Sequence, residues 1–178
     1  AAAGLYTAKS DIVQADLADV SSEWTVTEGE IALTITQFGS TVAGAFNDWT
    51  AAITFDENAT GVMGQVETTI AIGSLQLGSV TSDALGADFF NANTYPTALF
   101  TADIVANDAG YVAEGTLTIK DVTAPLNLPF TLVIDGDTAQ MEGTVEIDRR
   151  TFGIGQSMSD ETNLAFGVVV DIALTATR

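Results

Sequence analysis

Apolar and polar side chains alternate with a period of two along most of this chain, and this alternation is what most restricts its fold. Ile31, Leu33 and Ile35, for example, are separated by an alanine and a threonine. The same period recurs at residues 66–72, 111–119, 126–134, 141–147 and 168–174. Strands with one apolar and one polar face are typical of antiparallel sheets that cover a core. The chain is therefore predicted to be all-β.

Turn signals lie between the alternating runs, at residues 56–61, 107–110 and 135–137. The last of these, Asp135-Gly136-Asp137, is a hairpin signal that joins two of the clearest runs. Together the runs predict about eight strands with short connections, which favours a closed barrel or a sandwich.

Residues 79–96 depart from the period of two. Ser79 or Thr81 could cap a short helix that ends near Gly86, so a helical excursion is expected around residues 79–90. Such an excursion within a β meander is expected to cover a barrel mouth or a sheet edge.

Residues 1–22 are predicted to be an N-terminal extension or linker before a domain at 23–178. Within this extension Ile12, Val13, Leu17 and Val20 could form a short helix or an added edge strand.

The composition excludes several functions. The net charge of −19 repels phosphate backbones and anionic lipid headgroups, which argues against nucleic-acid binding. The chain has no cysteine and no histidine, which removes the usual nucleophile pairs and the usual metal ligands. No catalytic constellation is found, so the chain is predicted to be neither an enzyme nor a metal protein. Apolar residues make up 47% of the chain and must form a core or line a cavity.

Five segments carry a family pattern. They are the Trp24-Thr25-Val26 start with QFGSTVAGAFNDW at 37–49, ITFD at 53–56, DFFNANTYPTALF at 88–100, GTLTIKDVTAPLNLPF at 115–130, and IDRRTFGIG at 147–155. In this order and spacing they resemble the YceI-like family over residues 24–178. Two positions depart from it, because Lys120-Asp121 replaces a frequent His-Gly pair and Thr151 replaces an aspartate found in some members. Either change could alter which head group a ligand carries.

The resemblance implies an extended eight-stranded antiparallel lipocalin-like barrel with an apolar tunnel. It also implies an isoprenoid ligand, either a polyprenyl quinone such as ubiquinone or a polyprenyl phosphate. A periplasmic or secreted location is expected. The expected partners are this lipid and either a membrane or a fused redox (cytochrome) domain, in which case the module would serve electron transfer. The oligomeric state is left open, a dimer included.

The alternation alone favours a packed core, because an eight-stranded barrel is filled by side chains or holds one small ligand. The resemblance instead favours a tunnel. In that case Gly64, Gly115 and Gly143 leave room inside it, and replacing Gly115 with leucine should block lipid uptake while folding stays largely intact. The alternative for these glycines is a bulge or a close approach of strands.

Two further features have a functional and a structural interpretation. Phe89 and Phe90 either flank the lipid at one mouth of the barrel or plug that end as ordinary core. Arg149 is expected to point inward, where it either pairs with an inward acid or hydrogen-bonds a quinone carbonyl or a pyrophosphate. Arg150 is expected to be a solvated residue that balances nearby acids.

The residues predicted to contact the lipid combine the inward strand positions with these features. They are Ile31, Leu33, Ile35, Phe46, Ile53, Phe55, Phe89, Phe90, Phe100, Leu117, Phe130, Leu132, Val145, Ile147, Arg149, Phe152, Val168 and Val170. A second hypothesis is a non-lipid interaction module, carbohydrate-binding or structural, with a filled barrel.

Overall fold

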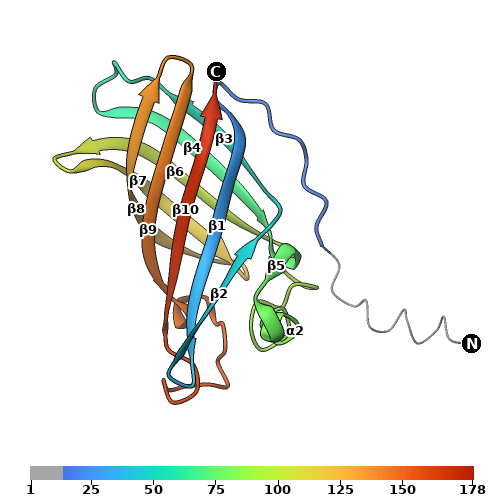
Figure 1. The fold of residues 1–178 in the computed structure, drawn as a ribbon. Coiled ribbons are helices and arrows are strands. Elements are labelled where there is room, and N and C mark those ends of the chain that lie inside the picture. The colour runs from blue at the N-terminus through green and yellow to red at the C-terminus, as the bar shows by residue number, and fades with distance from the viewer. Residues whose placement is uncertain (1–13) are drawn as a thin grey trace, which may run out of the picture.

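The computed structural model describes residues 14–178, which form a single antiparallel sheet curled into a half-barrel (Figure 1). The strands are β1 (Thr25–Gln37), β2 (Ser40–Phe46), β3 (Trp49–Phe55), β4 (Val62–Ala71), β5 (Leu75–Gln76), β6 (Thr97–Asn107), β7 (Gly110–Ile119), β8 (Val122–Asp135), β9 (Thr138–Asp148) and β10 (Gly167–Thr177). The short helices are η1 (Ile72–Ser74), η2 (Gly78–Val80), α2 (Thr81–Ala84) and η3 (Arg149–Phe152). The predicted all-β, lipocalin-like architecture is confirmed.

The sheet has ten strands where about eight were predicted, in the order β3-β4-β6-β7-β8-β9-β10-β1-β2-β5. The difference has two local causes. Asn47 and Asp48 interrupt what would otherwise be one long strand, and so divide it into β2 and β3. The two-residue strand β5 adds a short edge beside β2.

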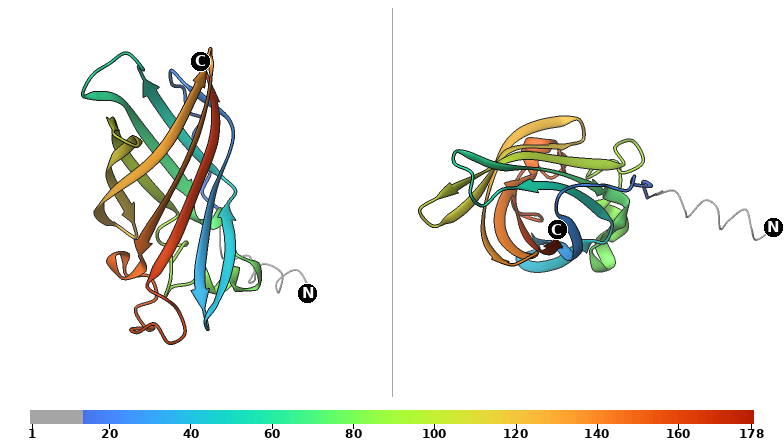
Figure 2. Two further views of the ribbon diagram at one scale, coloured as in Figure 1. Left: turned by 60° about the vertical axis from the view of Figure 1, so that its left-hand side comes forward. Right: turned by 90° about the horizontal axis from the view of Figure 1, so that it is seen from above.

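The first and last strands close most of the barrel. β1 pairs with β10 from Thr25↔Thr177 to Thr34↔Val169, with one bulge near Val26. Figure 2 shows, in its view from above, how the sheet curls around a central space. Every inward position of β8, from Leu126 to Ile134, faces this space, as the period of two predicted.

The glycines predicted to leave room inside the tunnel have a different role. A Cβ atom on Gly115 would overlap the carbonyl oxygen of Thr101 and the backbone of Ala102 on the neighbouring strand β6. Gly64 stands equally close to the backbone of Thr54. A Cβ atom on Gly143 would lie 2.8 Å from the carbonyl oxygen of Pro129. These glycines permit close approach of strands, so the expectation that Gly115→Leu would spare the fold was wrong.

Tight two-residue turns join several strands. Lys120 and Asp121, with φ of 53° and 61°, connect β7 to β8, and Phe38 and Gly39, with φ of 50° and 78°, connect β1 to β2. Positive φ at both central residues matches the right-handed twist of a hairpin. The predicted hairpin at Asp135-Gly136-Asp137 is confirmed between β8 and β9.

One end of the barrel, at the bottom of Figure 1, is covered by irregular segments at residues 72–96 and 149–166; we call it the lower end. The predicted short helix lies there as α2, with its C-cap at Leu85. Its N-cap is Val80 and has no side-chain cap, contrary to the expectation for Ser79 or Thr81. Thr81 instead accepts a hydrogen bond from the Leu77 N–H and donates to the Gly78 carbonyl.

Residues 14–23 form neither helix nor strand and are mostly exposed, so Leu17 and Val20 belong to no regular element. Ile12 and Val13 lie outside the described residues. Within the described range no helix has both the length and the apolar character that crossing a bilayer requires.

Candidate functional site

The space inside the barrel contains an apolar cavity of about 180 Å³. Strands from every part of the sheet except the short edge β5 contribute to its wall. Thr68 is the one residue with a polar side chain, apart from the indole N–H groups of Trp24 and Trp49, among those that line it. A cavity with such walls offers water almost no hydrogen-bonding partner, and cavities of this kind stay dry and take up apolar molecules.

Most of the residues predicted to contact a ligand line this cavity. They are Ile31, Leu33, Phe46, Ile53, Phe55, Phe90, Phe100, Leu117, Phe130, Leu132, Val145, Ile147, Val168 and Val170. Ile35, Phe89, Arg149 and Phe152 do not line it. Contact with a ligand stays a prediction for the whole set.

Other residues, outside the set predicted to contact the ligand, also line the cavity from the same inward faces. They include Trp24, Trp49, Ala51, Val66, Ile70, Ile104, Ala113, Leu126, Leu128, Ile134, Met141, Ile172 and Leu174. The alternation that identified Leu132 and Val170 also marks most of these positions, since a strand that contributes one inward residue contributes every second one.

The two neighbouring phenylalanines at the lower end point to different surroundings. Phe90 lines the cavity and packs edge-on against Phe46, with ring centroids 5.9 Å apart. The ring of Phe89 instead packs beside Gly155. Gly155 also donates a backbone hydrogen bond to the Asp88 carbonyl at 2.7 Å, so this pair joins the two irregular segments. One residue therefore fits the functional interpretation and the other fits the structural one.

Arg149 is buried at the lower end, with 2% of its surface exposed, and its guanidinium group donates only to backbone carbonyls. The accepting carbonyls lie 2.7–3.3 Å away and belong to Ile154, Gly155, Met158, Asp160, Leu164 and Ala165. A guanidinium group has five N–H donors in a fixed planar arrangement, and here they hold the segment between η3 and β10 in one conformation.

Arg149 is buried, but its guanidinium group points into the loop between η3 and β10 and not into the cavity, and the expected acid partner is wrong. Within residues 14–178 no carboxylate forms a salt bridge with it. Burial lowers the pKa of this guanidinium from its ordinary value. Every N–H group already has a carbonyl acceptor, so a ligand head group would have to displace part of the loop.

Arg150 lies at the surface, as predicted, and pairs with Asp148 at 2.6 Å. Its guanidinium carbon also lies 3.7 Å from the centre of the Phe166 ring. Hydrogen bonds from Arg150 lower the pKa of the Asp148 carboxyl, and those to Asp148 raise the pKa of Arg150. Asp148 also accepts from the Arg150 backbone N–H and so caps η3.

Lys120, which departs from the family pattern, reaches the same lower end. Its ammonium group donates to the carbonyl of Gly153 at 2.9 Å and is partly buried. An ammonium group has three N–H donors, so this contact leaves two of them for other acceptors. Lys120, Arg149 and Arg150 thus gather three of the five basic residues of the chain at one end of the barrel.

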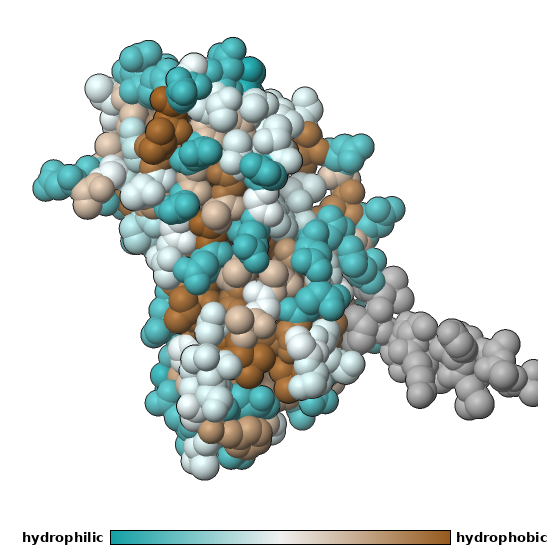
Figure 3. Space-filling model, in the orientation of Figure 1, coloured by the Kyte–Doolittle hydropathy of each residue, from teal (hydrophilic) through white to brown (hydrophobic). Residues whose placement is uncertain are grey.

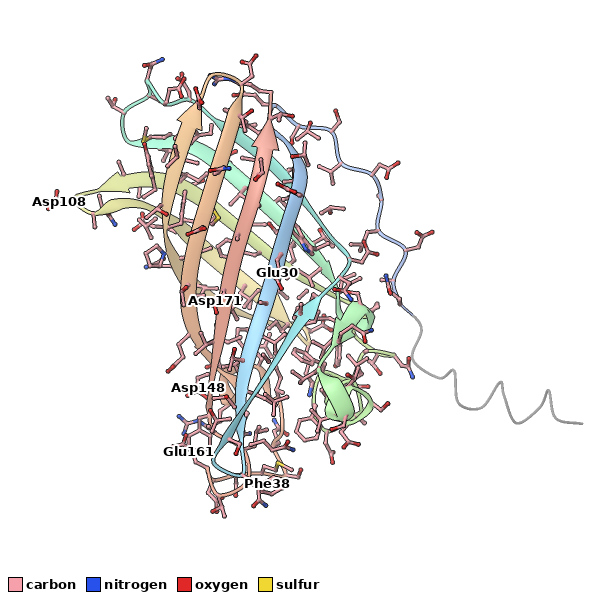
Figure 4. All side chains as sticks on the ribbon, in the orientation of Figure 1. Glu30, Phe38, Asp108, Asp148, Glu161 and Asp171 are labelled. Atoms are coloured by element: carbon pink, nitrogen blue, oxygen red, sulfur yellow. The ribbon has the colours of Figure 1, made fainter. Side chains whose placement is uncertain are left out.

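The outer face of the barrel is acidic. Glu30 and Asp171 lie on the strands β1 and β10, Asp148 ends β9, and Asp108 and Glu161 lie in the β6–β7 turn and in the loop before β10 (Figure 4). Figure 3 shows hydrophilic residues spread over this face, with small apolar patches between them. In the part of the chain that the structure describes, no group of three acids is placed to hold a metal ion.

Comparison with known proteins adds a family match. The family described as the YceI-like domain matches residues 19–175. A UPF0312 protein of Pseudomonas aeruginosa is 30% identical over 137 residues, which is 70% of this chain and 71% of that protein. A UPF0312 protein of Pectobacterium carotovorum is 33% identical, but the match spans only 59% of its length.

Two solved structures have the same fold. The crystal structure of BcnA from Burkholderia cenocepacia superposes with a TM-score of 0.77 at 30% identity, covering 84% of this chain and 96% of that one. A polyisoprenoid-binding domain from Saccharophagus degradans, implicated in plant cell wall breakdown, superposes with a TM-score of 0.64. Its identity is 13%, with 88% of this chain and 99% of that chain covered, so the likeness is one of fold.

Proposed function

The chain belongs to the YceI-like domain family, and from that premise we propose that it binds and carries an isoprenoid lipid in its apolar cavity. The observation that supports this most directly is the cavity itself, whose wall is almost wholly aliphatic and aromatic. The likeness to a solved polyisoprenoid-binding domain is in keeping with this proposal. No step of catalysis is proposed.

A polyprenyl tail suits such a wall. Each buried CH₂ group contributes about 0.8 kcal/mol of transfer free energy, whereas ordering the flexible tail offsets part of this gain. The wall offers an isoprenoid chain almost no hydrogen-bonding group beyond the Thr68 hydroxyl and the Trp49 indole N–H, since the Trp24 indole N–H donates to the Phe55 carbonyl. Binding therefore depends on shape and apolar area. The tail therefore sets the affinity more than any single polar contact does.

The polar head is placed at the lower end in this proposal. Lys120 has N–H donors left after its bond to Gly153, and Arg150 lies at the surface nearby. Either cation could bind the carbonyl of a quinone such as ubiquinone or the phosphate of a polyprenyl phosphate. Arg149 then supports the loop that surrounds the head, and does not itself bind it.

The wider role is also part of the proposal. A carrier of quinones would serve electron transfer as a module of a larger protein, in the periplasm or in a secreted form. The partner in that case is a membrane or a fused redox domain, which would donate or accept the quinone.

Native mass spectrometry of the purified protein tests the proposal. We expect a one-to-one adduct from which solvent extraction releases a polyprenyl quinone or a polyprenyl phosphate. The head group in the extract decides between these two ligands. A protein that stays free of adduct after incubation with ubiquinone and with polyprenyl phosphate would contradict the carrier function.

A pair of variants connects the adduct to the cavity. Ala113 lines the cavity and is buried, so Ala113→Leu should fill part of the space and reduce the adduct. Ala173 lies exposed on the outer face of β10, so Ala173→Leu adds the same volume where no ligand is expected. Equal adduct in the two variants would mean that the lipid binds elsewhere. That result would favour the non-lipid interaction module.

A further inference from the structure

The barrel wall contains a line where two neighbouring strands lack a hydrogen-bonded ladder. It runs between Thr25–Glu30 of β1 and Trp49–Ala52 of β3, and we call it the seam. The sheet order places β3 and β1 apart, and among the described residues one backbone hydrogen bond joins them, from the Trp24 N–H to the Ile53 carbonyl at 3.1 Å. In Figure 1 the chain bends after β2, and β3 then runs behind the upper part of β1.

Both ends of the seam are fixed. At its upper end Trp24 bonds Ile53 through its backbone and Phe55 through its indole N–H, and the Arg178 guanidinium stacks on its ring. At its lower end the buried Ser74 accepts a hydrogen bond from the Asp48 backbone N–H and holds the bend between β2 and β3. The strands between these points are held by side chains alone.

Trp49 fills the inner side of the seam. Its ring lines the cavity and reaches Gly29, where a Cβ atom would lie 3.0 Å from the indole Cη2. On the other side of the wall, residues Thr27–Glu30 of β1 are all exposed. The indole ring of Trp49 therefore lies between the cavity and the exposed stretch of β1 at Gly29.

The size of the cavity gives the seam a role. An apolar cavity of about 150 Å³ holds one benzene molecule. The cavity here, about 180 Å³, is only slightly larger and is too small for a polyprenyl tail of several units. The wall must widen to admit such a tail, and widening along any ladder would break a series of backbone hydrogen bonds, each with a cost. Widening along the seam breaks none between its fixed ends.

We propose that the apolar ligand enters and leaves sideways through the β1–β3 seam, with Trp49 as the side chain that moves aside. The inference rests on the proposed function, since it assigns an entry route to the same ligand. It also assigns Trp49 a kinetic role in addition to its place in the wall.

A disulfide across the seam tests the route, because the native chain has no cysteine. In an antiparallel arrangement Thr25 and Ala52 are the positions next to the bridged pair Trp24↔Ile53, so Thr25→Cys with Ala52→Cys is designed to lock β1 to β3. The matched control is Gln140→Cys with Thr175→Cys, which face each other in the continuous β9–β10 ladder. Uptake of the uncharged apolar dye N-phenylnaphthylamine is followed by stopped-flow fluorescence in the oxidised and reduced forms.

Oxidation of the seam pair should slow both uptake and release of the dye by about tenfold, while the control pair shows no change. Equal rates in the two redox forms of the seam pair would overturn the route and leave the proposed function intact. Failure of the reduced proteins to take up the dye at all would overturn the proposed function and, with it, the route.

A second pair of variants tests the role of Trp49. Trp49→Ala should speed uptake and release together, so that the equilibrium affinity changes less than either rate. Val133→Ala removes an exposed side chain from the outer face of the continuous β8–β9 ladder and should leave the rates unchanged. Equal kinetics in these two variants would overturn the assignment of Trp49.

Discussion

In the barrel wall, hydrogen bonds run between neighbouring strands at regular intervals, whereas in the loop between η3 and β10 they converge on one side chain, Arg149. The wall depends on many equivalent contacts, and most single residues in it can change without loss of the ladder. The loop between η3 and β10 depends on one guanidinium group that holds six carbonyls. A single substitution is therefore expected to have a large effect where many hydrogen bonds meet on one side chain, or where two strands leave no room for a side chain.

The largest effect is expected at Gly115, one of the few wall positions where the strands approach too closely for a side chain. Gly115→Leu would push β6 away from β7 and should lower the free energy of unfolding by about 4 kcal/mol or more. Urea unfolding measures the change. Ala113→Leu, two residues along the same strand, is the control and should have a much smaller effect. Equal stability in the two variants would show that the strands can part without cost.

The next effect is expected at Arg149. Arg149→Met would leave buried carbonyls without a donor and should lower the free energy of unfolding by about 3 kcal/mol. Arg149→Lys should restore only part of this, because an ammonium group lacks the planar set of five donors. Arg150→Met, at the exposed neighbour, should leave stability nearly unchanged. A stable Arg149→Met variant would mean that the loop is held by its apolar contacts.

The response to acid gives a smaller and pH-dependent effect. The folded-state pKa of Asp148 lies below its ordinary value because Arg150 donates hydrogen bonds to it. The resulting stability is therefore present above about pH 4 and is lost as the pH falls through the folded-state pKa. Melting temperatures of the native protein and Asp148→Asn should differ at neutral pH and converge in acid. A difference that persists in acid would rule out the carboxylate as its source.

The smallest effect is expected at the hairpin tip between β1 and β2. Phe38 is 70% exposed and has a positive φ, which a bulky side chain adopts at a cost. Asparagine before glycine is the preferred pair for such a turn, so Phe38→Asn should raise the free energy of unfolding by about 0.5 kcal/mol. Chemical denaturation can resolve this gain. A loss of stability would show that the Phe38 ring makes a contact that the turn needs.

The same contrast explains how much could be predicted from the sequence. The wall follows from the period of two, which correctly placed Leu132, Val145 and Val170 toward the cavity. The hairpin at Asp135-Gly136-Asp137 followed from turn chemistry in the same way. Both depend on residues that are close in the sequence, so a local pattern contains the information.

The lower end depends on contacts between distant segments, which no local pattern contains. The position of Arg149 in the sequence predicted that its side chain is buried. It could not predict the acceptors, because these are backbone carbonyl groups and every residue type carries a carbonyl group. For the same reason the sequence could not show that Phe89 packs beside Gly155 while Phe90 lines the cavity. The close strand approach at Gly115 was predicted only as the alternative to room in the tunnel, because a glycine in a strand looks the same whether it leaves room or avoids a clash.

The pairing of β1 with β10 has a consequence for how the protein is made. Thr25 pairs with Thr177, so one edge of β1 waits for a partner that the ribosome adds at the end of the domain, although its other edge pairs early with β2. Pairings this distant in sequence close slowly, since the entropy of a long loop is lost before any contact compensates for it. The strands β6 to β9 can pair with their neighbours earlier, during synthesis. Until the last strand joins, the inward faces stay open to water and to other chains, and no ligand can be enclosed.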